Sequence, residues 1–236
     1  MAPTYQAIRE HPFLTGLSDG TLAPEAFAHY VAQDGLYLRE YARCLAIVGG
    51  KAPNVADLAM FARHATGAVE VELAQHELPG LEPDSAVQLG SAVTGTVTPT
   101  TQAYTSYLLA TAYGGSFVEG LAAVLPCYWI YAEVGKALSA NGSPVPQYQR
   151  WIDSYAGDEF AALVSEVLDL VDRVGPGLGA AERERAQRHL RVAARYEWMF
   201  WDAAYRSERW PIDERGMGDE RGAGDGRGTD DERRTA

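Results

Sequence analysis

Three groups able to do covalent and proton chemistry stand in aromatic surroundings, in separate stretches of this 236-residue sequence. They are a cysteine, Cys127, and two acids, Asp34 and Glu197. A thiol is a nucleophile, and a nearby carboxyl group can pass protons to a leaving group. If the three stretches converge, we expect a closed pocket with flat aromatic walls, which suits a small planar heterocycle.

The cysteine lies inside a long apolar helical stretch, directly after Pro126. A proline there leaves the Ala122 carbonyl without its helical partner, which favours a kink and a space beside Cys127 and Tyr131. The alternative is a small buried hydrophobe in an aromatic core. No histidine is close in the sequence, so unless the fold brings one near, the thiol needs activation by a tyrosine, a carboxylate or the substrate.

The aspartate shares a helix face with two tyrosines, since Asp34, Tyr37 and Tyr41 have helical spacing. A carboxylate on an inward face needs a partner, because burying it alone is costly. Two interpretations remain open: a structural hydrogen bond to a tyrosine or the backbone, or a carboxylate that receives N–H donors of a ligand.

The glutamate shares its face with Phe200 and Trp201. Desolvation there would raise the pKa of Glu197, as a proton donor and acceptor near neutral pH requires. Alternatively, the side chain reaches past the aromatic rings to solvent, to Arg195 or to Arg206.

Almost every segment has helical periodicity, and no clear strand alternation appears. We therefore predict one all-α domain over residues 1–212, followed by a disordered tail over 213–236, which is rich in Gly, Asp and Arg. The expected helices cover about residues 24–48, 54–78, 84–92, 99–113, 116–140, 148–155, 159–174 and 180–208.

Three polar residues are expected near helix starts. Asn54 is predicted to cap the helix over residues 54–78, and Asp158 is predicted to cap the helix over residues 159–174. His11 belongs to a short lead-in and is expected to be a surface or capping residue.

Composition narrows the function classes. The net charge of −12 argues against nucleic-acid binding, which needs clustered Lys and Arg. Two cysteines provide no disulfide framework. We see no signal peptide and no run of about 18 apolar residues that suggests a membrane span. The expected setting is soluble and cytoplasmic.

Acids and histidines gather between residues 64 and 77, but their spacing lacks a Glu-x-x-His pair. His64 and His76 are more than three helical turns apart, too far for one metal. We expect a solvated or interface face, with no metal and no cofactor. The residues concerned are His64, Glu70, Glu72, His76 and Glu77.

Six short motifs, in order along residues 5–210, together resemble the TenA family, the class II thiaminases or aminopyrimidine aminohydrolases, in its cysteine-containing branch. They are Leu22-x-Pro24-Glu25-x-Phe27-x-x-Tyr30, Gln33-Asp34-x-Leu36-Tyr37-Leu38, Pro99-Thr100-x-x-Ala103-Tyr104-Thr105, Leu125-Pro126-Cys127-x-Trp129-x-Tyr131-x-Glu133-x-Gly135, Trp151-Ile152-x-x-Tyr155-x-x-x-Glu159-Phe160 and Glu197-x-x-Phe200-Trp201-x-x-Ala204-Tyr205.

This resemblance implies a haem-oxygenase-like helical fold, usually without haem, and a homotetramer. It implies hydrolysis of 4-amino-5-aminomethyl-2-methylpyrimidine to the hydroxymethyl compound and ammonia in thiamin salvage, with cleavage of thiamin as well. The small-molecule pyrimidine would be the partner, with no nucleic acid and no membrane.

The resemblance also implies site roles. Cys127 would add to the pyrimidine ring, and Glu197 would protonate the ring or leaving group and then activate water. Asp34 would hold the substrate's amino and ring nitrogens, and Tyr155 would orient the thiol. The residues lining and stacking the ring would be Tyr37, Tyr104, Tyr131 and Phe200. Cys44 matches no catalytic position and is predicted to lie in the core.

Two alternatives stay open at this point. A haem-oxygenase-like oxidase would need a histidine, or a Glu and His set, aimed into the bundle. A non-catalytic regulatory protein would keep the pyrimidine pocket without needing the thiol.

Overall fold

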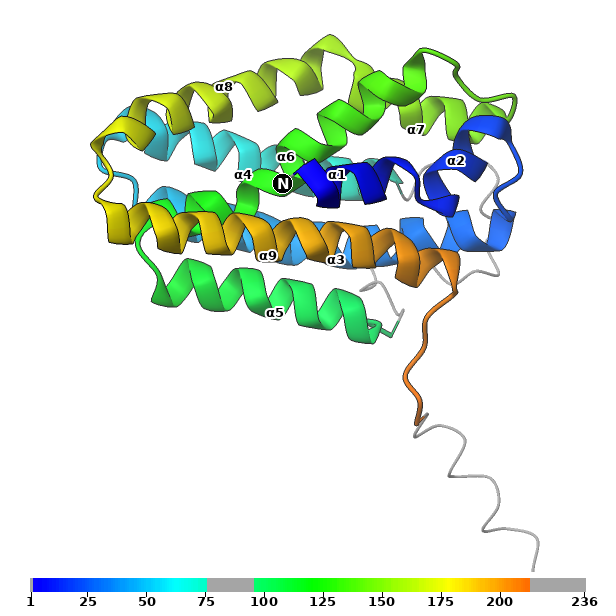
Figure 1. The fold of residues 1–236 in the computed structure, drawn as a ribbon, viewed down its shortest axis with the longest axis horizontal. Coiled ribbons are helices and arrows are strands. Elements are labelled where there is room, and N and C mark those ends of the chain that lie inside the picture. Colours follow the sequence, from blue (N-terminus) through cyan, green and yellow to red (C-terminus); the bar gives the residue numbers. More distant parts are fainter. Residues whose placement is uncertain (1, 76–95, 213–236) are drawn as a thin grey trace, which may run out of the picture.

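The computed structural model describes residues 2–75 and 96–212, and within them every regular element is a helix (Figure 1). The predicted all-α class is therefore confirmed. The elements are α1 (Ala2–Arg9), α2 (Pro12–Asp19), α3 (Pro24–Gly50), α4 (Val55–Gln75), α5 (Pro99–Gly114), α6 (Phe117–Ser139), α7 (Pro146–Ala156), α8 (Asp158–Val174), the short 3-10 turn η1 (Gly175–Gly177) and α9 (Ala180–Tyr205).

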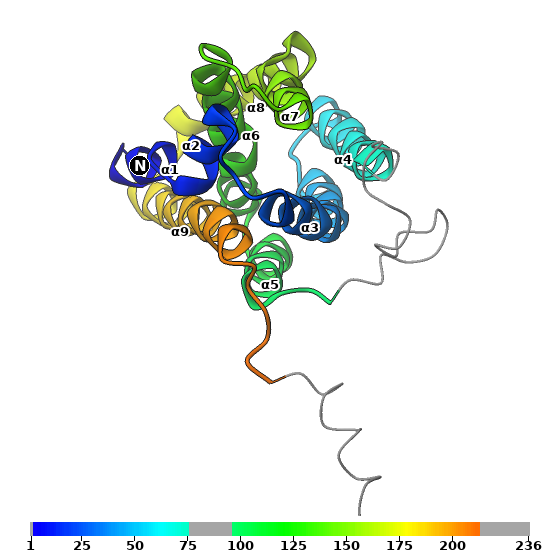
Figure 2. The same cartoon turned by 90° about the vertical axis from the view of Figure 1, so that its right-hand side faces the viewer.

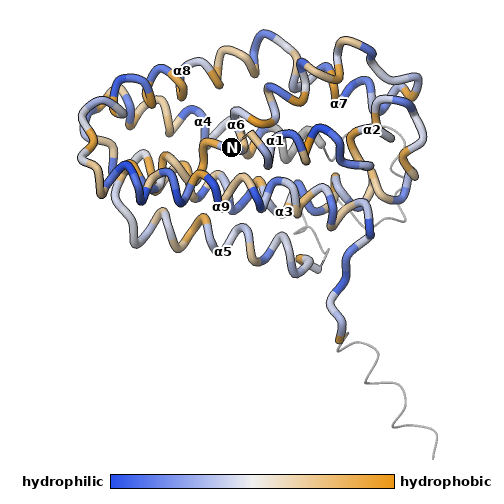
Figure 3. Tube along the Cα trace, in the orientation of Figure 1, coloured by the Kyte–Doolittle hydropathy of each residue, from blue (hydrophilic) through white to orange (hydrophobic). Residues whose placement is uncertain are grey.

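The apolar helix α6 lies at the centre of the bundle. It packs against α3, α5, α7, α8 and α9, and Figure 2 shows these helices around it. Among the described residues, α6 alone is long and apolar enough to cross a membrane, yet 61% of that stretch is buried inside the bundle. The apolar side chains of α6 therefore form part of the protein core. Apolar and polar residues alternate along the other helices (Figure 3).

Most helices begin at a proline or at a side chain that caps the first turn. Proline is the first residue of α2, α3, α5 and α7, where its missing N–H breaks no helical bond. Ser116 and Glu119 form a capping box at α6. The Asn54 carboxamide accepts the Asp57 N–H at 2.9 Å, which confirms the predicted cap of α4.

The N-terminal lead-in forms two helices, and His11 caps α2, which confirms the capping alternative, although its side chain is buried. Two other expectations differ from the structure. Asp158 is the first residue of α8, and Gly157 holds the cap position. The last helix ends at Tyr205, because Glu208 and Trp210 turn away from it to bond to the start of α5.

The predicted helix over residues 84–92 and the predicted tail over 213–236 lie outside the described residues. So do the end of the helix expected to reach residue 78, and His76 and Glu77.

Candidate active site

The three predicted reactive groups come together in the bundle interior. Asp34 projects from α3, Cys127 from α6 and Glu197 from α9. The charges of Glu197 and Asp34 both act on the thiol, and Asp34 also acts on Glu197. Their convergence places a thiol and two carboxyl groups in one centre.

Glu197 is 1% exposed and accepts a 2.6 Å hydrogen bond from the hydroxyl of Tyr104, which projects from α5. Burial raises the pKa of Glu197 to about 8, the Tyr104 hydrogen bond lowers it, and Asp34 raises it. The alternative, in which this carboxyl reaches solvent or an arginine, is therefore excluded. A carboxyl group with this pKa can both give and take a proton near neutral pH.

Cys127 keeps part of its accessible surface, although Val124 and Tyr131, one turn away on either side, are buried. The side chain is packed against the hydrophobic core on this inward face of α6. Burial, and then the charge of Glu197, raises the pKa of the thiol well above its usual value. Cys127 therefore rests as a neutral thiol at physiological pH.

Two tyrosine hydroxyls from α3 oppose this rise. Tyr37 and Tyr41 both stabilise the thiolate of Cys127 and lower its pKa. The Tyr41 hydroxyl also donates to the Val124 carbonyl at 2.9 Å. The Tyr37 hydroxyl is buried and makes no hydrogen bond of normal geometry within the described residues, which leaves it able to bond a ligand.

Aromatic rings form the walls of this centre. The Tyr37 ring lies 5.1 Å from the Tyr104 ring and 5.6 Å from the Phe200 ring, measured between centroids. On the other side, the Tyr131 ring is 4.8 Å from Tyr155 and 5.1 Å from Trp201. Offset and tilted rings at these distances form stable flat surfaces.

Tyr155 projects from α7 and is half-buried. Its hydroxyl interacts with that of Tyr30, and the Tyr30 hydroxyl donates to the Tyr131 hydroxyl at 3.3 Å. The charge of Cys127 raises the pKa of Tyr155, but the hydroxyls that lower the pKa of the thiol are those of Tyr37 and Tyr41. The sequence pattern placed Tyr41 on the correct helix face but indicated no interaction with Cys127.

Asp34 is 2% exposed and acts electrostatically on Tyr30, Tyr131 and Tyr155. Its neighbour Gln33 is anchored on the other side of α3: the carboxamide donates to the Thr96 carbonyl at 3.2 Å and accepts from the Thr98 N–H at 3.0 Å. The segment leading into α5 is thereby tied to the helix turn that carries Asp34.

Sequence reasoning also misplaced His64. It was assigned to a solvated or interface face, yet it is 4% exposed and its Nδ1 lies 3.0 Å from the Tyr128 hydroxyl. Glu70, on the same helix, is exposed as expected. Cys44 is fully buried and desolvation raises its pKa to about 12, which confirms its prediction as a core residue.

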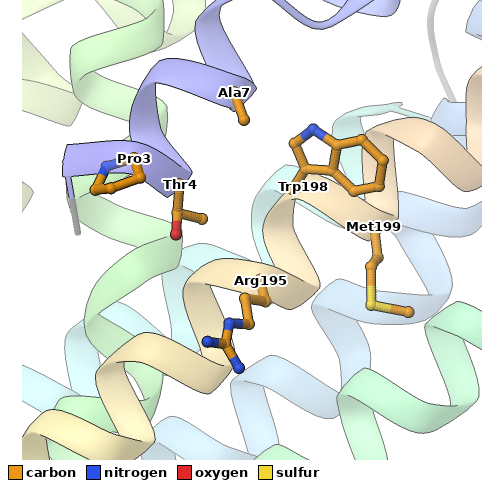
Figure 4. A pocket seen from close by; sticks show the side chains of 6 residues that line it. All are labelled: Pro3, Thr4, Ala7, Arg195, Trp198 and Met199. Atoms are coloured by element: carbon orange, nitrogen blue, oxygen red, sulfur yellow. The ribbon is translucent and has the colours of Figure 1, made fainter.

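An apolar hollow opens on the outer face of α9, against α1 (Figure 4). It contains none of the predicted site residues. Its lining is Pro3, Thr4, Ala7, Arg195, Trp198 and Met199. Within residues 2–75 and 96–212, no three His, Cys, Asp or Glu side chains are grouped to hold a metal ion.

Comparison with known proteins places these features in a family context. A model of the TENA/THI-4/PQQC family matches residues 1–207. The aminopyrimidine aminohydrolase of Bacillus subtilis (strain 168) is 34% identical over 204 residues, covering 85% of this chain and 84% of that protein. A solved TenA homologue from P. horikoshii OT3 is 32% identical, with a TM-score of 0.77, covering 87% of this chain and 94% of that one.

A third match bears on the fold alone. A domain with a heme oxygenase-like fold from Shewanella denitrificans OS217 is 18% identical, with a TM-score of 0.66, covering 87% of this chain and 89% of that one. The predicted haem-oxygenase-like fold is thereby confirmed.

Proposed function

Because this chain belongs to the TENA/THI-4/PQQC family, we propose that it is a hydrolase of thiamin metabolism, an aminopyrimidine aminohydrolase of the thiaminase II type. Its substrate would be 4-amino-5-aminomethyl-2-methylpyrimidine, and its products the hydroxymethyl pyrimidine and ammonia. Thiamin would be cleaved at the same centre. The observation that carries this proposal is a thiol and a carboxyl group with a pKa of about 8 enclosed among aromatic rings.

Glu197 is proposed as the acid and then the base. With a pKa of about 8 it is mostly protonated at neutral pH, so it can give its proton to the ring or to the departing nitrogen. The carboxylate that remains can then take a proton from water as the hydroxyl product forms. The Tyr104 hydrogen bond holds the carboxyl in place through both steps.

Cys127 is proposed as the nucleophile. Its thiol lies among the aromatic side chains of the bundle, and addition to the pyrimidine ring would split one difficult substitution into two easier steps. Tyr37 and Tyr41 support the proposal because their hydroxyls stabilise negative charge on the sulfur.

The remaining site residues are proposed to bind and orient the substrate. Asp34 would accept hydrogen bonds from the amino group and a protonated ring nitrogen. Tyr155 would orient the thiol. The residues proposed to line and stack the ring are Tyr37, Tyr104, Tyr131 and Phe200.

We further propose a homotetramer in the cytoplasm. The apolar hollow between α1 and α9 and the half-exposed Met199 are features that an assembly could cover. Sedimentation of the full chain tests the assembly directly, and a monomer at micromolar concentration would contradict it.

The function is tested by incubating the purified protein with the aminomethyl pyrimidine and measuring ammonia release. We expect release by the wild type and its collapse in Cys127→Ala. The matched control is Cys44→Ala, which removes the other thiol, buried away from the site, and should retain release if the variant stays folded. Equal release from wild type and Cys127→Ala would contradict the nucleophile. No release by folded wild type would contradict the substrate.

A further inference from the structure

The proposed function needs the Glu197 carboxyl to give a proton and then take one at the same place, and the following inference rests on that function. The Tyr104 hydroxyl donates to this carboxyl at 2.6 Å. A phenol holds its O–H in the plane of its ring, so the tilt of the Tyr104 ring sets the direction of this bond. Packing that fixes the Tyr104 ring therefore also fixes the acid.

Two other rings contact the ring of Tyr104. Tyr37, from α3, lies 5.1 Å away between centroids, with 32° between the ring planes. Tyr196, from α9, lies at the same 5.1 Å, but its plane is within 10° of parallel. Nearly parallel rings at this separation are offset-stacked, an arrangement that favours one orientation of each ring over others. Tyr196 is therefore the contact that best fixes the plane of Tyr104.

Tyr196 directly precedes Glu197 in α9, so two consecutive residues of one helix hold Tyr104 of α5. Tyr196 stacks on its ring, and Glu197 accepts its hydroxyl hydrogen. Successive side chains of a helix point about 100° apart, which lets one residue face the interior while its neighbour faces α5. Tyr196 is half-buried, whereas Tyr104 is 1% exposed. The stack thus runs from the buried acid toward the protein surface.

The Tyr196 ring is itself supported by α5. Tyr107, one turn after Tyr104, has its ring 5.6 Å from that of Tyr196, with 41° between the planes. The Tyr107 hydroxyl lies 2.7 Å from Nδ1 of His189, which projects from α9 two turns before Tyr196. Two tyrosines of α5 therefore hold the Tyr196 ring, and the ring contacts that it makes are with them.

We propose that Tyr196 is a positioning residue for the acid: its ring, stacked on that of Tyr104, keeps the Tyr104 hydroxyl directed at the Glu197 carboxyl while this carboxyl gives and then takes a proton. Tyr196 acts through Tyr104 and has no contact with substrate in this role. Its loss should therefore lower kcat and leave KM nearly unchanged.

The direction of the effect follows from the groups around Glu197. Burial raises the pKa of Glu197, the Tyr104 hydrogen bond lowers it, and Asp34 raises it. Weakening the Tyr104 bond should therefore raise the pKa of Glu197 further. The titratable groups that interact with Glu197 are Asp34, Tyr37 and Tyr41 on α3, Tyr104 on α5, and Cys127 and Tyr131 on α6.

The test measures the pKa of Glu197 without substrate. Infrared absorption of protonated carboxyl groups is followed in the full-length protein from about pH 6, where ordinary carboxyl groups are ionised, to about pH 10. The Glu197 band is identified by its loss in Glu197→Gln. In Tyr196→Leu, which keeps an apolar side chain without a ring, we expect the pKa to rise by about half a unit. Tyr196→Phe keeps the stacked ring and should retain the wild-type value.

A double-mutant cycle separates positioning from a general loosening of the fold. In Tyr104→Phe the hydroxyl is already absent, so adding Tyr196→Leu should raise the pKa of Glu197 no further. The matched control is Tyr107→Phe, which keeps the ring beside Tyr196, removes only the hydroxyl next to His189, and should leave the pKa unchanged. With the aminomethyl pyrimidine, kcat of Tyr196→Leu should fall by roughly tenfold.

A purely structural role gives a different pattern. It would lower Tm in Tyr196→Leu and leave the pKa of Glu197 at the wild-type value, and that result overturns the proposal. So do additive shifts in the double variant, or an equal shift in Tyr107→Phe. If Tyr196→Leu does not fold, Tyr196→Met fills more of the same volume and makes the same test. If the pKa depends on Tyr196 but folded wild type releases no ammonia, the positioning role stands and the proposed aminohydrolase activity fails.

Discussion

The Tyr104 hydroxyl lies 2.6 Å from the carboxyl of Glu197, and each of these residues is 1% exposed. The two come from different helices, α5 and α9, so the bond ties the position of α5 to the protonation of the acid. Burial raises the pKa of Glu197 and this bond limits the rise.

Removing that hydroxyl should raise the pKa of Glu197 further. In Tyr104→Phe the carboxylate loses a hydrogen bond to a charged group, so we expect its pKa to rise by about one unit. The measurement is the pH dependence of kcat/KM, whose limb assigned to Glu197 should move to higher pH. Tyr107→Phe, outside the pocket, is the control, and an unmoved limb in Tyr104→Phe would contradict the assignment.

Burial of Glu197 should make stability depend on pH. Its folded pKa of about 8 lies above the ordinary value of 4.5, so between these values the folded state holds a proton that the unfolded state releases. Stability from this group is therefore full at low pH and declines as pH rises through this window.

Glu197→Gln removes this titration. Relative to the wild type, the variant should gain free energy of unfolding between pH 5 and pH 8.5, on the order of 3 kcal/mol. Urea denaturation of the wild type and of the variant at both pH values gives the two free energies of unfolding. Subtracting the wild-type value from that of the variant cancels the titration of all other groups. A constant difference would show that Glu197 titrates normally.

The close approach of α6 and α7 can be tested at one glycine. A Cβ at Gly135 would lie 2.6 Å from the backbone carbonyl carbon of Tyr155. Gly135→Ala should therefore push α7 away, cost about 2 kcal/mol of stability and displace the Tyr155 ring. Activity should fall more than the loss of folded protein explains.

Gly67→Ala is the matched helical control. No atom lies within 4 Å of a Cβ at Gly67, so the alanine should stabilise α4 by about 0.5 to 1 kcal/mol. Thermal unfolding of both variants makes the comparison. Equal stability changes would mean that α6 and α7 are not held at this distance.

Two truncations separate the segment after α9 from the tail. Glu208 accepts from the Thr100 N–H at 2.8 Å, and the Trp210 indole donates to the Val97 carbonyl at 2.7 Å. Ending the chain after Ser207 should cost about 1 to 2 kcal/mol, because the start of α5 loses its cap. Ending it after Ile212 should leave Tm and activity unchanged, as expected of a disordered tail; loss in that variant would contradict the domain boundary.

Local signals in the sequence were enough to place most helices. Proline at helix starts and glycine at helix ends gave α3, α5 and α6 to within a few residues, and helical spacing correctly put Asp34, Tyr37 and Tyr41 on one inward face.

What could not be predicted depends on partners far apart in the chain. His64 is buried because its Nδ1 has a partner 3.0 Å away, the hydroxyl of Tyr128 on another helix. No local pattern near residue 64 predicts that contact. Likewise, the link between Tyr104 and Glu197 joins residues 93 positions apart. The convergence of Cys127 with both acids was expected through family resemblance, since spacing alone left the structural alternatives open.

The groups acting most strongly on Cys127 and Glu197 are acids and hydroxyls, with no lysine or arginine among them. Such a pocket selects by charge. An aminomethyl group, protonated in water, would find a counter-ion in Asp34, whereas a phosphate ester would bring a dianion beside that carboxylate, where no described residue that acts most strongly on Cys127 or Glu197 is a cation. The enzyme should therefore bind free pyrimidines in preference to their phosphate esters, because the site repels the phosphate charge, independently of how well either molecule fits.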